Sequence, residues 1–358
     1  MTLLLVEPLS DDQLNRVYSD ILSPLAWDLG HIANFEELWL VQTIGEREPM
    51  DGDLGRFYDA IENPRATRNE LPILRGEELR TYMSEVRERT LDVLDSLDLE
   101  DSEDRLLRDG FVYELILAHE HQHNETMLQL LQMVESYEPA DPAAIPAPAT
   151  HERPARDQVP HTSLEAGEHE IGAGETGFAY DNERPRHTVE LEAFEIDVRP
   201  VLSADWIAFM EDTGAEPPLY WERDPDAGWM RTAMGRTVAV DMADPVVHVD
   251  HRAATAFAQW AGKRLPTEFE WEAAAKSGAL EMLGEVWEWT SSDFEAYPGF
   301  EAFPYDEYSK VFFGPDHKVL RGGSWATREN VKRVSFRNWD LPQRRQIFSG
   351  LRCARDAE

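Results

Sequence analysis

Cysteine is almost absent from this chain of 358 residues, and the single one is Cys353. One cysteine excludes a disulfide within the chain, and it also excludes zinc or iron–sulfur sites built on cysteine ligands. Any metal ion must therefore be held by histidine and carboxylate side chains. Long apolar runs are absent too, since none approaches the roughly 20 residues that span a bilayer. Residues 1–7 lack the basic flank of a signal peptide, so we expect a cytoplasmic protein.

Basic residues are scarce as well. The chain has 34 Lys and Arg against 70 Asp and Glu, which gives a formal net charge of −36. Charges of one sign repel one another at low salt, and the repulsion weakens as the Debye length falls from about 10 Å at 0.1 M to about 3 Å at 1 M. An acidic excess spread over both halves predicts a salt-adapted protein. It also makes nucleic acid and anionic membranes poor partners.

The character of the sequence changes near residue 138. Residues 1–137 carry apolar side chains at helical spacing, most clearly over 111–133, and predict a helical bundle. Residues 138–160 contain six prolines, which exclude a continuous helix and indicate a Pro/Ala-rich linker. Residues 161–358 are rich in Gly, Trp and short β-type segments. The predicted fold class is therefore a multidomain α+β protein.

The strongest local signal is the sequence AHEHQHNE at residues 118–125. His119 and His123 are four residues apart, so on a helix both rings project from one face and can converge on one ion. His121 points elsewhere. His31 lies on an apolar segment and offers a third imidazole. A buried histidine needs a partner for each ring nitrogen, and a metal ion can supply one of them. Three neutral imidazoles suit Zn, Fe(II) or Cu, and spacing alone does not choose among them.

With these histidines identified, the chain resembles a known family. The Trp27…His31 segment, together with His119-x-x-x-His123-x-Glu125, is similar to the iron-binding motif of the DinB-like domain of ergothioneine sulfoxide synthases, the hercynine oxygenases. The second half resembles the formylglycine-generating-enzyme (sulfatase-modifying-factor) fold through GKRLPTEFEW (262–271), GEVWEWT (284–290) and LRGGSW (320–325). FRNWD (336–340) and RRQIF (344–348) resemble the synthases in particular.

The resemblance implies a fold for each half. Residues 1–137 would form a DinB-like four-helix bundle. Residues 161–358 would form a C-type-lectin-like α+β domain with little regular structure. Either fold alone hosts several functions, whereas their combination in this order is specific to the synthases.

The resemblance also implies an activity. The family joins hercynine (Nα-trimethylhistidine) to cysteine or γ-glutamylcysteine with Fe(II) and O2, and gives a sulfoxide in ergothioneine biosynthesis. The implied residues are His31, His119 and His123 for iron; Gln122, Asn338 and Trp339 for hercynine; Arg65, Arg68, Asp340 and Arg344 for the thiol substrate; and Tyr305 or Tyr308 as proton donor.

These residue types suit those roles. Arginine forks bind carboxylates and an aspartate binds an ammonium group, while an aromatic face accommodates a trimethylammonium group. Two arginines, Arg65 and Arg68, favour γ-glutamylcysteine, which has the extra carboxylate. Three tryptophans and one arginine of the second half are expected in the core instead, the arginine in a structural ion pair; they are Trp271, Trp287, Trp289 and Arg321.

Two departures from the family pattern stand out. Glu285 stands where family members usually have Asn. Residues 276–279 stand where family members have a longer insertion. A structural Ca2+ ion is a further expectation of the resemblance. Loss of the insertion can remove the site for this ion.

Three other functions share part of this pattern. A formylglycine-generating enzyme proper needs a pair of active-site cysteines, so it is excluded. An ovothiol-type synthase acting on histidine normally carries an extra methyltransferase domain, so this function is not the one expected here. A non-catalytic zinc-binding scaffold is the alternative from another class, although it would not need the polar residues Asn338 to Arg344. Small-molecule substrates and a monomer are expected.

Overall fold

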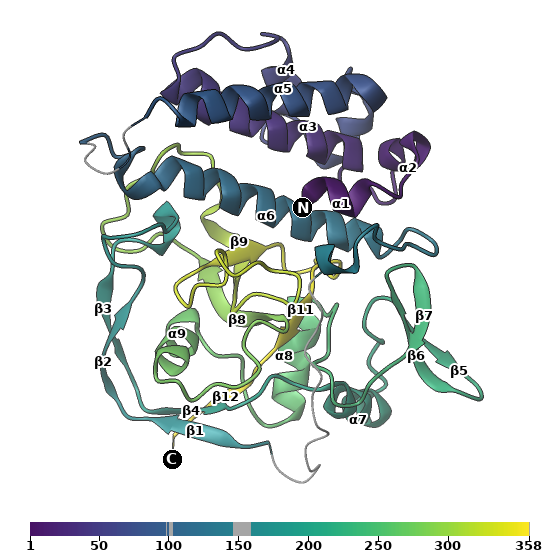
Figure 1. The fold of residues 1–358 in the computed structure, drawn as a ribbon. Helices are drawn as coiled ribbons and strands as arrows, with labels where there is room; N and C mark the ends of the chain where they lie inside the picture. Colours follow the sequence, from purple (N-terminus) through teal and green to yellow (C-terminus); the bar gives the residue numbers. More distant parts are fainter. Residues whose placement is uncertain (98, 100–102, 146–158, 358) are drawn as a thin grey trace. The chain divides into compact units, whose positions relative to one another are not determined.

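The computed structural model describes residues 1–97, 99, 103–145 and 159–357. The chain divides into two compact units, of which the first comprises Met1–Ile145 with Thr176–Phe178 and the second comprises Pro146–Glu175 with Ala179–Glu358. The first is helical and the second mixes helices with small sheets (Figure 1), so the predicted α+β class is confirmed. Residues 146–158 of the predicted linker lie outside the described residues.

Three longer helical segments dominate the first unit. They are α3 (Leu25–Glu36), continued by the π-helix η1 (Glu37–Ile44), then α5 (Gly76–Leu94) and α6 (Phe111–Leu131). Helix α3 packs against both α5 and α6, and α1 packs against α6. The shorter elements are α1 (Thr2–Val6), α2 (Asp11–Asn15), α4 (Leu54–Tyr58), η2 (Arg65–Glu70), η3 (Arg108–Gly110) and η4 (Pro142–Ala144).

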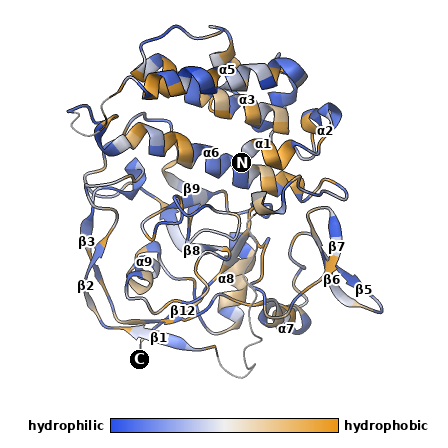
Figure 2. Ribbon diagram, in the orientation of Figure 1, coloured by the Kyte–Doolittle hydropathy of each residue, from blue (hydrophilic) through white to orange (hydrophobic). Residues whose placement is uncertain are grey.

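Helix α3 is the centre of this unit. All of its residues except Asn34 are buried, which is the pattern of a helix covered on every face. Its apolar residues account for much of the orange colour along α3 in Figure 2. Glu36, the last residue of α3, is buried with them, and so are two polar residues further inside the helix: Asp28 is 2% exposed and His31 is 7% exposed. Buried polar groups need hydrogen-bonding partners, so these two side chains mark where the helix departs from pure packing.

The second unit is built from short strands in four small sheets. The sheet orders are β1-β4-β12, β2-β3, β5-β6-β7 and β10-β9-β8-β11. The elements are β1 (His161–Leu164), β2 (Gly167–Ile171), η5 (Asp181–Glu183), β3 (His187–Leu191), β4 (Phe194–Asp197), α7 (Ser203–Thr213), β5 (Trp221–Asp224), β6 (Gly228–Ala233), β7 (Arg236–Ala239), α8 (His251–Trp260), α9 (Glu268–Lys276), β8 (Trp287–Phe294), η6 (Lys310–Phe312), β9 (Gly314–Arg321), β10 (Asn338–Asp340), β11 (Ser349–Leu351) and β12 (Ala354–Asp356).

The core of the second unit contains the residues predicted for it. Trp271, Trp287 and Trp289 are all buried. Arg321 is fully buried and its guanidinium pairs with the buried carboxylate of Glu272, which confirms the predicted structural ion pair. Removing one partner of such a pair leaves an uncompensated charge, at a cost of about 3–5 kcal/mol. The pair therefore fixes α9 against β9.

A second buried ion pair holds the strand that carries three predicted site residues. Arg337, immediately before β10, donates from two nitrogens to the carboxylate of Glu268 at 2.7 and 2.8 Å. It also donates to the carbonyl oxygen of Asn182 at 2.9 Å. Both charged side chains are buried. The start of β10 is thus tied to α9 and to η5.

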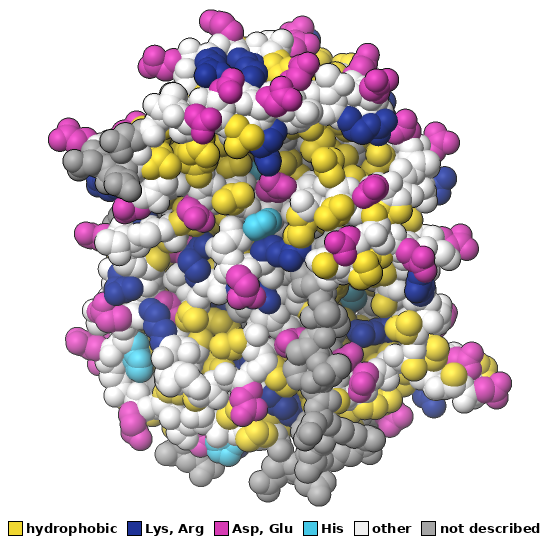
Figure 3. Space-filling view, in the orientation of Figure 1, with side chains coloured by type: hydrophobic (Ala, Val, Ile, Leu, Met, Phe, Trp, Pro, Cys, Tyr) yellow, Lys and Arg dark blue, Asp and Glu magenta, His cyan; other side chains and the backbone are white. Residues whose placement is uncertain are grey.

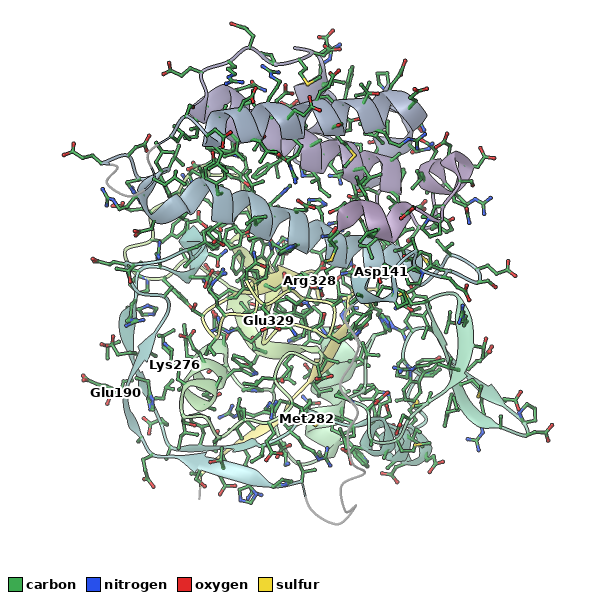
Figure 4. All side chains as sticks on the ribbon, viewed as in Figure 1. Asp141, Glu190, Lys276, Met282, Arg328 and Glu329 are labelled. Carbon is green, nitrogen blue, oxygen red and sulfur yellow. The ribbon has the colours of Figure 1, made fainter. Side chains whose placement is uncertain are left out.

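The shortened segment after α9 forms a compact turn. Lys276, labelled in Figure 4, ends the helix, pairs with Glu272 at 2.7 Å and donates to the carbonyl of Glu170 at 2.7 Å. Gly278 adopts a left-handed φ of +75°, and Met282 has a φ of +56°. Two left-handed residues let the chain reverse within a few positions.

Within the described residues, no helix is long and apolar enough to cross a membrane.

Candidate metal centre and substrate residues

Three histidines of the first unit converge. His31 comes from α3, and His119 and His123 come from α6. One ligand nitrogen of each lies within 4.8 Å of the others, and the Nε2 atoms of His31 and His119 are 3.1 Å apart. Two nitrogens that each lie about 2.1 Å from one ion are about 3 Å apart at a right angle, so this spacing suits a shared ion. In the part of the chain that the structure describes, no other group of three His, Cys, Asp or Glu residues converges in this way.

Groups behind two of these rings bear on which nitrogen faces the shared point. Nδ1 of His31 lies 2.6 Å from the carbonyl oxygen of Tyr58. A carbonyl only accepts, so Nδ1 carries the hydrogen and Nε2 keeps its lone pair toward the other histidines. Nδ1 of His123 lies 3.4 Å from the buried carboxylate of Asp28. A carbonyl or carboxylate behind the ring is the usual arrangement for a metal-binding histidine.

The surroundings keep two of the imidazoles neutral. Burial, with the nearby His123, lowers the pKa of His31 well below its usual value, and the same two causes act on His119. Trp27 stacks on His31 with ring centroids 4.7 Å apart, and Phe35 stacks on His119 at 3.8 Å. Neutral rings keep their lone pairs available near pH 7. The donor set therefore fits a divalent ion such as Fe(II), Zn or Cu.

The sequence did not predict the two groups that lie behind His31 and His123, which are the Tyr58 carbonyl and the Asp28 carboxylate. Asp28 was visible as a charged residue in an apolar helix, three positions before His31, and that was the available signal. Tyr58 contributes only its backbone carbonyl, which no residue type announces. Glu125, the last residue of the motif that begins at His119, is buried but is not part of the converging group. Gln122 is half-buried on α6, next to His123.

The two predicted arginines have different environments. Arg65 is exposed and donates to the carbonyl of Ile21 at 3.2 Å. Arg68 is buried, its guanidinium lies 3.6 Å over the ring of Trp27, and burial lowers its pKa to about 10. Each of its three nitrogens donates to the protein, at 2.7 to 2.9 Å, and the acceptors are Asn63 O, Ser23 Oγ and Ala60 O. Arg68 therefore supports the ring that stacks on His31.

In the second unit, the predicted tyrosines and Trp339 share one aromatic cluster. Trp339 on β10 stacks on Phe294 at 4.2 Å, and Tyr308 meets Trp339 edge-on at 5.6 Å. Tyr180 stacks on Tyr308 at 4.1 Å, and Tyr305 meets Tyr308 edge-on at 6.4 Å. Burial raises the pKa of Tyr305 well above its usual value, so its phenol stays protonated. Both tyrosines remain candidates.

The other predicted residues of this unit follow along the chain. Asn338 and Asp340 are half-buried at the two ends of β10. The Asn338 side-chain oxygen accepts from the backbone N–H of Trp339 at 3.0 Å. Asp340 pairs with the buried Arg344 at 3.5 Å. The two predicted thiol-binding charges are therefore neighbours.

A buried carboxylate anchors the segment that carries both tyrosines. Asp181 accepts from the hydroxyl of Ser309 and from the backbone N–H of Phe303 at 3.4 Å. Ser309 in turn accepts from the amide of Asn182 at 2.9 Å. Asp181 is 6% exposed, and burial raises its pKa from 3.8 to about 6. Sequence reasoning did not single out this residue.

That raised pKa predicts a specific pH dependence. Below pH 7 the folded state takes up a proton at Asp181 before the unfolded chain does, so this group adds stability as the pH falls. Relative to Asp181→Asn, the wild type should gain about 1 kcal/mol of unfolding free energy between pH 8 and pH 5. Urea unfolding at the two pH values measures it. The exposed Asp316→Asn removes a surface charge as a control, and equal pH dependence in wild type and Asp181→Asn would contradict the assignment.

Comparison with known proteins covers both units. A DinB superfamily model matches residues 1–127, and a sulfatase-modifying factor enzyme 1-like domain matches 147–281 and 276–357. Hercynine oxygenases of Mycolicibacterium smegmatis and Mycobacterium tuberculosis are 38% and 36% identical, each over 99% of this chain and 96% of their own length. The formylglycine-generating enzyme of Streptomyces coelicolor is 30% identical, over 60% of this chain and 94% of its own. The predicted kinship is confirmed, and the chain belongs to the hercynine oxygenase family of oxidoreductases.

Proposed function

We propose that this chain is an iron- and O2-dependent sulfoxide synthase that joins hercynine to a thiol in ergothioneine biosynthesis. The observation that carries the proposal is the convergence of three imidazoles, with His31 buried and His123 half-buried, in a chain of this family. His31, His119 and His123 would hold the iron. When bound, iron would activate O2 and acidify a thiol held beside it.

The hercynine-binding role falls to two amides and an aromatic ring. Gln122 and Asn338 can each donate to and accept from the imidazole of hercynine. Trp339 presents an indole face, and a quaternary ammonium, which has no hydrogen to donate, is attracted to such a face. The stacking of Trp339 on Phe294 at 4.2 Å supports this role because it holds the ring in one orientation.

The thiol-binding role falls to charged side chains. Asp340 suits the ammonium group of the thiol substrate, while Arg344 and Arg65 suit its carboxylates. Arg68 is engaged by three protein acceptors, so we assign recognition of the additional carboxylate to the exposed Arg65. A second carboxylate group in the substrate favours γ-glutamylcysteine over cysteine. The protonated phenol of Tyr305, or that of Tyr308, would hold the proton delivered during the reaction.

The direct test is O2 uptake by iron-loaded protein supplied with hercynine and γ-glutamylcysteine or cysteine. We expect uptake that needs both organic substrates, and a product whose mass is that of the coupled sulfoxide. His119→Ala should lose activity by about 100-fold or more, since a metal ligand is removed. His121→Ala, on the same helix two residues away, is the matched control and should stay within about twofold.

The outcomes separate the rival functions. Absence of O2 uptake with any thiol at high salt would leave the zinc-binding scaffold as the better account. Uptake with histidine in place of hercynine would indicate an ovothiol-type synthase. In the same assay, kcat/KM for γ-glutamylcysteine should exceed that for cysteine, and the reverse order would contradict the role given to Arg65.

We also propose that the chain is adapted to high salt. The support is its formal charge of −36 and the scatter of acidic side chains, interspersed with Lys and Arg, over the face shown in Figure 3. Such charges repel one another across distances that low salt does not screen. The folded state brings them closer than the unfolded chain does, so screening favours folding.

The salt proposal predicts a steep rise of stability with ionic strength. Between 0.1 M and 2 M KCl the unfolding free energy should increase by about 2 kcal/mol or more, because the Debye length shrinks severalfold. Thermal or urea unfolding at a series of KCl concentrations measures this. Sorbitol of equal osmolality is the control, since it carries no charge. A stability that does not change with KCl would contradict salt adaptation.

A further inference from the structure

His248 is a buried histidine of the second unit that none of the roles above uses. It is 5% exposed and has a left-handed φ of +66°, which is uncommon for a residue other than glycine. Its Nδ1 atom lies 3.1 Å from the carbonyl oxygen of Arg345 and 3.1 Å from that of Ile347. Both partners are pure acceptors, so Nδ1 carries the hydrogen and shares it between them.

The two carbonyls belong to the loop of residues 341–348, which joins β10 to β11 and contains no helix or strand. Such a loop lacks a ladder of backbone hydrogen bonds, so other groups must satisfy its carbonyls. Arg344, buried and paired with Asp340 at 3.5 Å, lies directly before the first carbonyl that His248 binds. The direction of the Arg344 side chain depends on the backbone of this loop.

Other contacts fix His248 itself. Tyr220, also left-handed with a φ of +71°, meets the His248 ring edge-on with centroids 4.9 Å apart. The backbone N–H of Leu219 donates to the carbonyl of His248 at 3.1 Å. Phe348 packs on the same ring at 5.3 Å. Backbone strain of this kind persists only where the surroundings over-determine it.

The loop has a second tether to the same region. Arg345 donates from its guanidinium to the carbonyl of Pro217 at 2.6 Å, three residues before Tyr220. The backbone N–H of His251 donates to the carbonyl of Pro342 at 3.0 Å. The 341–348 loop is therefore held by residues 217–220 and 248–251, with His248 as the side chain that reaches its middle. Burial, the largest cause, lowers the pKa of His248 to about 4, so the ring is neutral at pH 7 and its single N–H is the one on Nδ1.

We propose that His248 is a positioning residue for the thiol substrate: its Nδ1–H group fixes the loop that presents Arg344 beside Asp340. The inference rests on the proposed function, in which these two charges bind the thiol. His248 touches neither substrate in this account and acts through the loop. Its loss should therefore weaken recognition of the thiol and leave recognition of hercynine unchanged.

Two variants isolate the hydrogen bond. His248→Phe keeps a ring for Tyr220 and Phe348 to pack against but has no donor. His248→Asn places an amide nitrogen where Nδ1 stands, and asparagine tolerates a left-handed backbone. We expect His248→Phe to raise KM for γ-glutamylcysteine about tenfold or more, with KM for hercynine and the bound iron unchanged. We expect His248→Asn to restore KM to within about threefold of the wild type.

Each outcome decides the matter. A thiol KM within twofold of the wild type in His248→Phe, or an equal rise in both KM values, would overturn the proposal. If His248→Phe does not fold, His248→Gln replaces it, since its donor lies one methylene too far; equal thiol KM values for the Asn and Gln variants would overturn the proposal. A wild type without thiol-dependent O2 uptake would overturn the proposed function instead, so the two failures are distinguishable.

Discussion

A buried imidazole needs partners for its ring nitrogens, and this requirement shapes the surroundings of His31 in the first unit. The carbonyl of Tyr58 takes the hydrogen of His31, and the carboxylate of Asp28 lies behind His123. One nitrogen of each of the three rings lies within 4.8 Å of the others. Trp27 stacks on His31, and the guanidinium of Arg68 lies over the ring of Trp27, so the orientation of the His31 ring is supported from behind. Lone pairs so arranged are stabilised by a cation.

The second unit meets a different demand, which is to hold irregular backbone in one conformation. Its strands are short, so buried charges and single side chains replace long ladders of backbone hydrogen bonds. Arg337 fixes the start of β10, Asp181 anchors the segment that carries both tyrosines, and His248 holds the 341–348 loop. Each of these groups is buried, and each binds backbone or a charged partner. The positions of the predicted substrate-binding residues therefore depend on groups that need not touch the substrate.

The sequence predicted what local spacing and motif can carry. The i, i+4 histidine pair lies on the predicted helix, and Arg321 forms the buried ion pair expected of it. The sequence could not predict partners that act through backbone or across distant segments, such as the Tyr58 carbonyl, 27 residues from His31. Arg65 and Arg68 looked equivalent in the sequence, yet only Arg68 is buried, because a ring of α3 and three acceptors surround it. Such differences arise from tertiary packing.

The central claim is that the three histidines form one metal site, and ligand identity at the metal tests it most directly. Protein stripped of metal and titrated anaerobically with Fe(II) should bind one ion per chain. X-ray absorption at the iron edge should then show three imidazole nitrogens, and one fewer in His123→Ala. Iron that binds without histidine ligands, or a spectrum that His123→Ala leaves unchanged, would contradict the account.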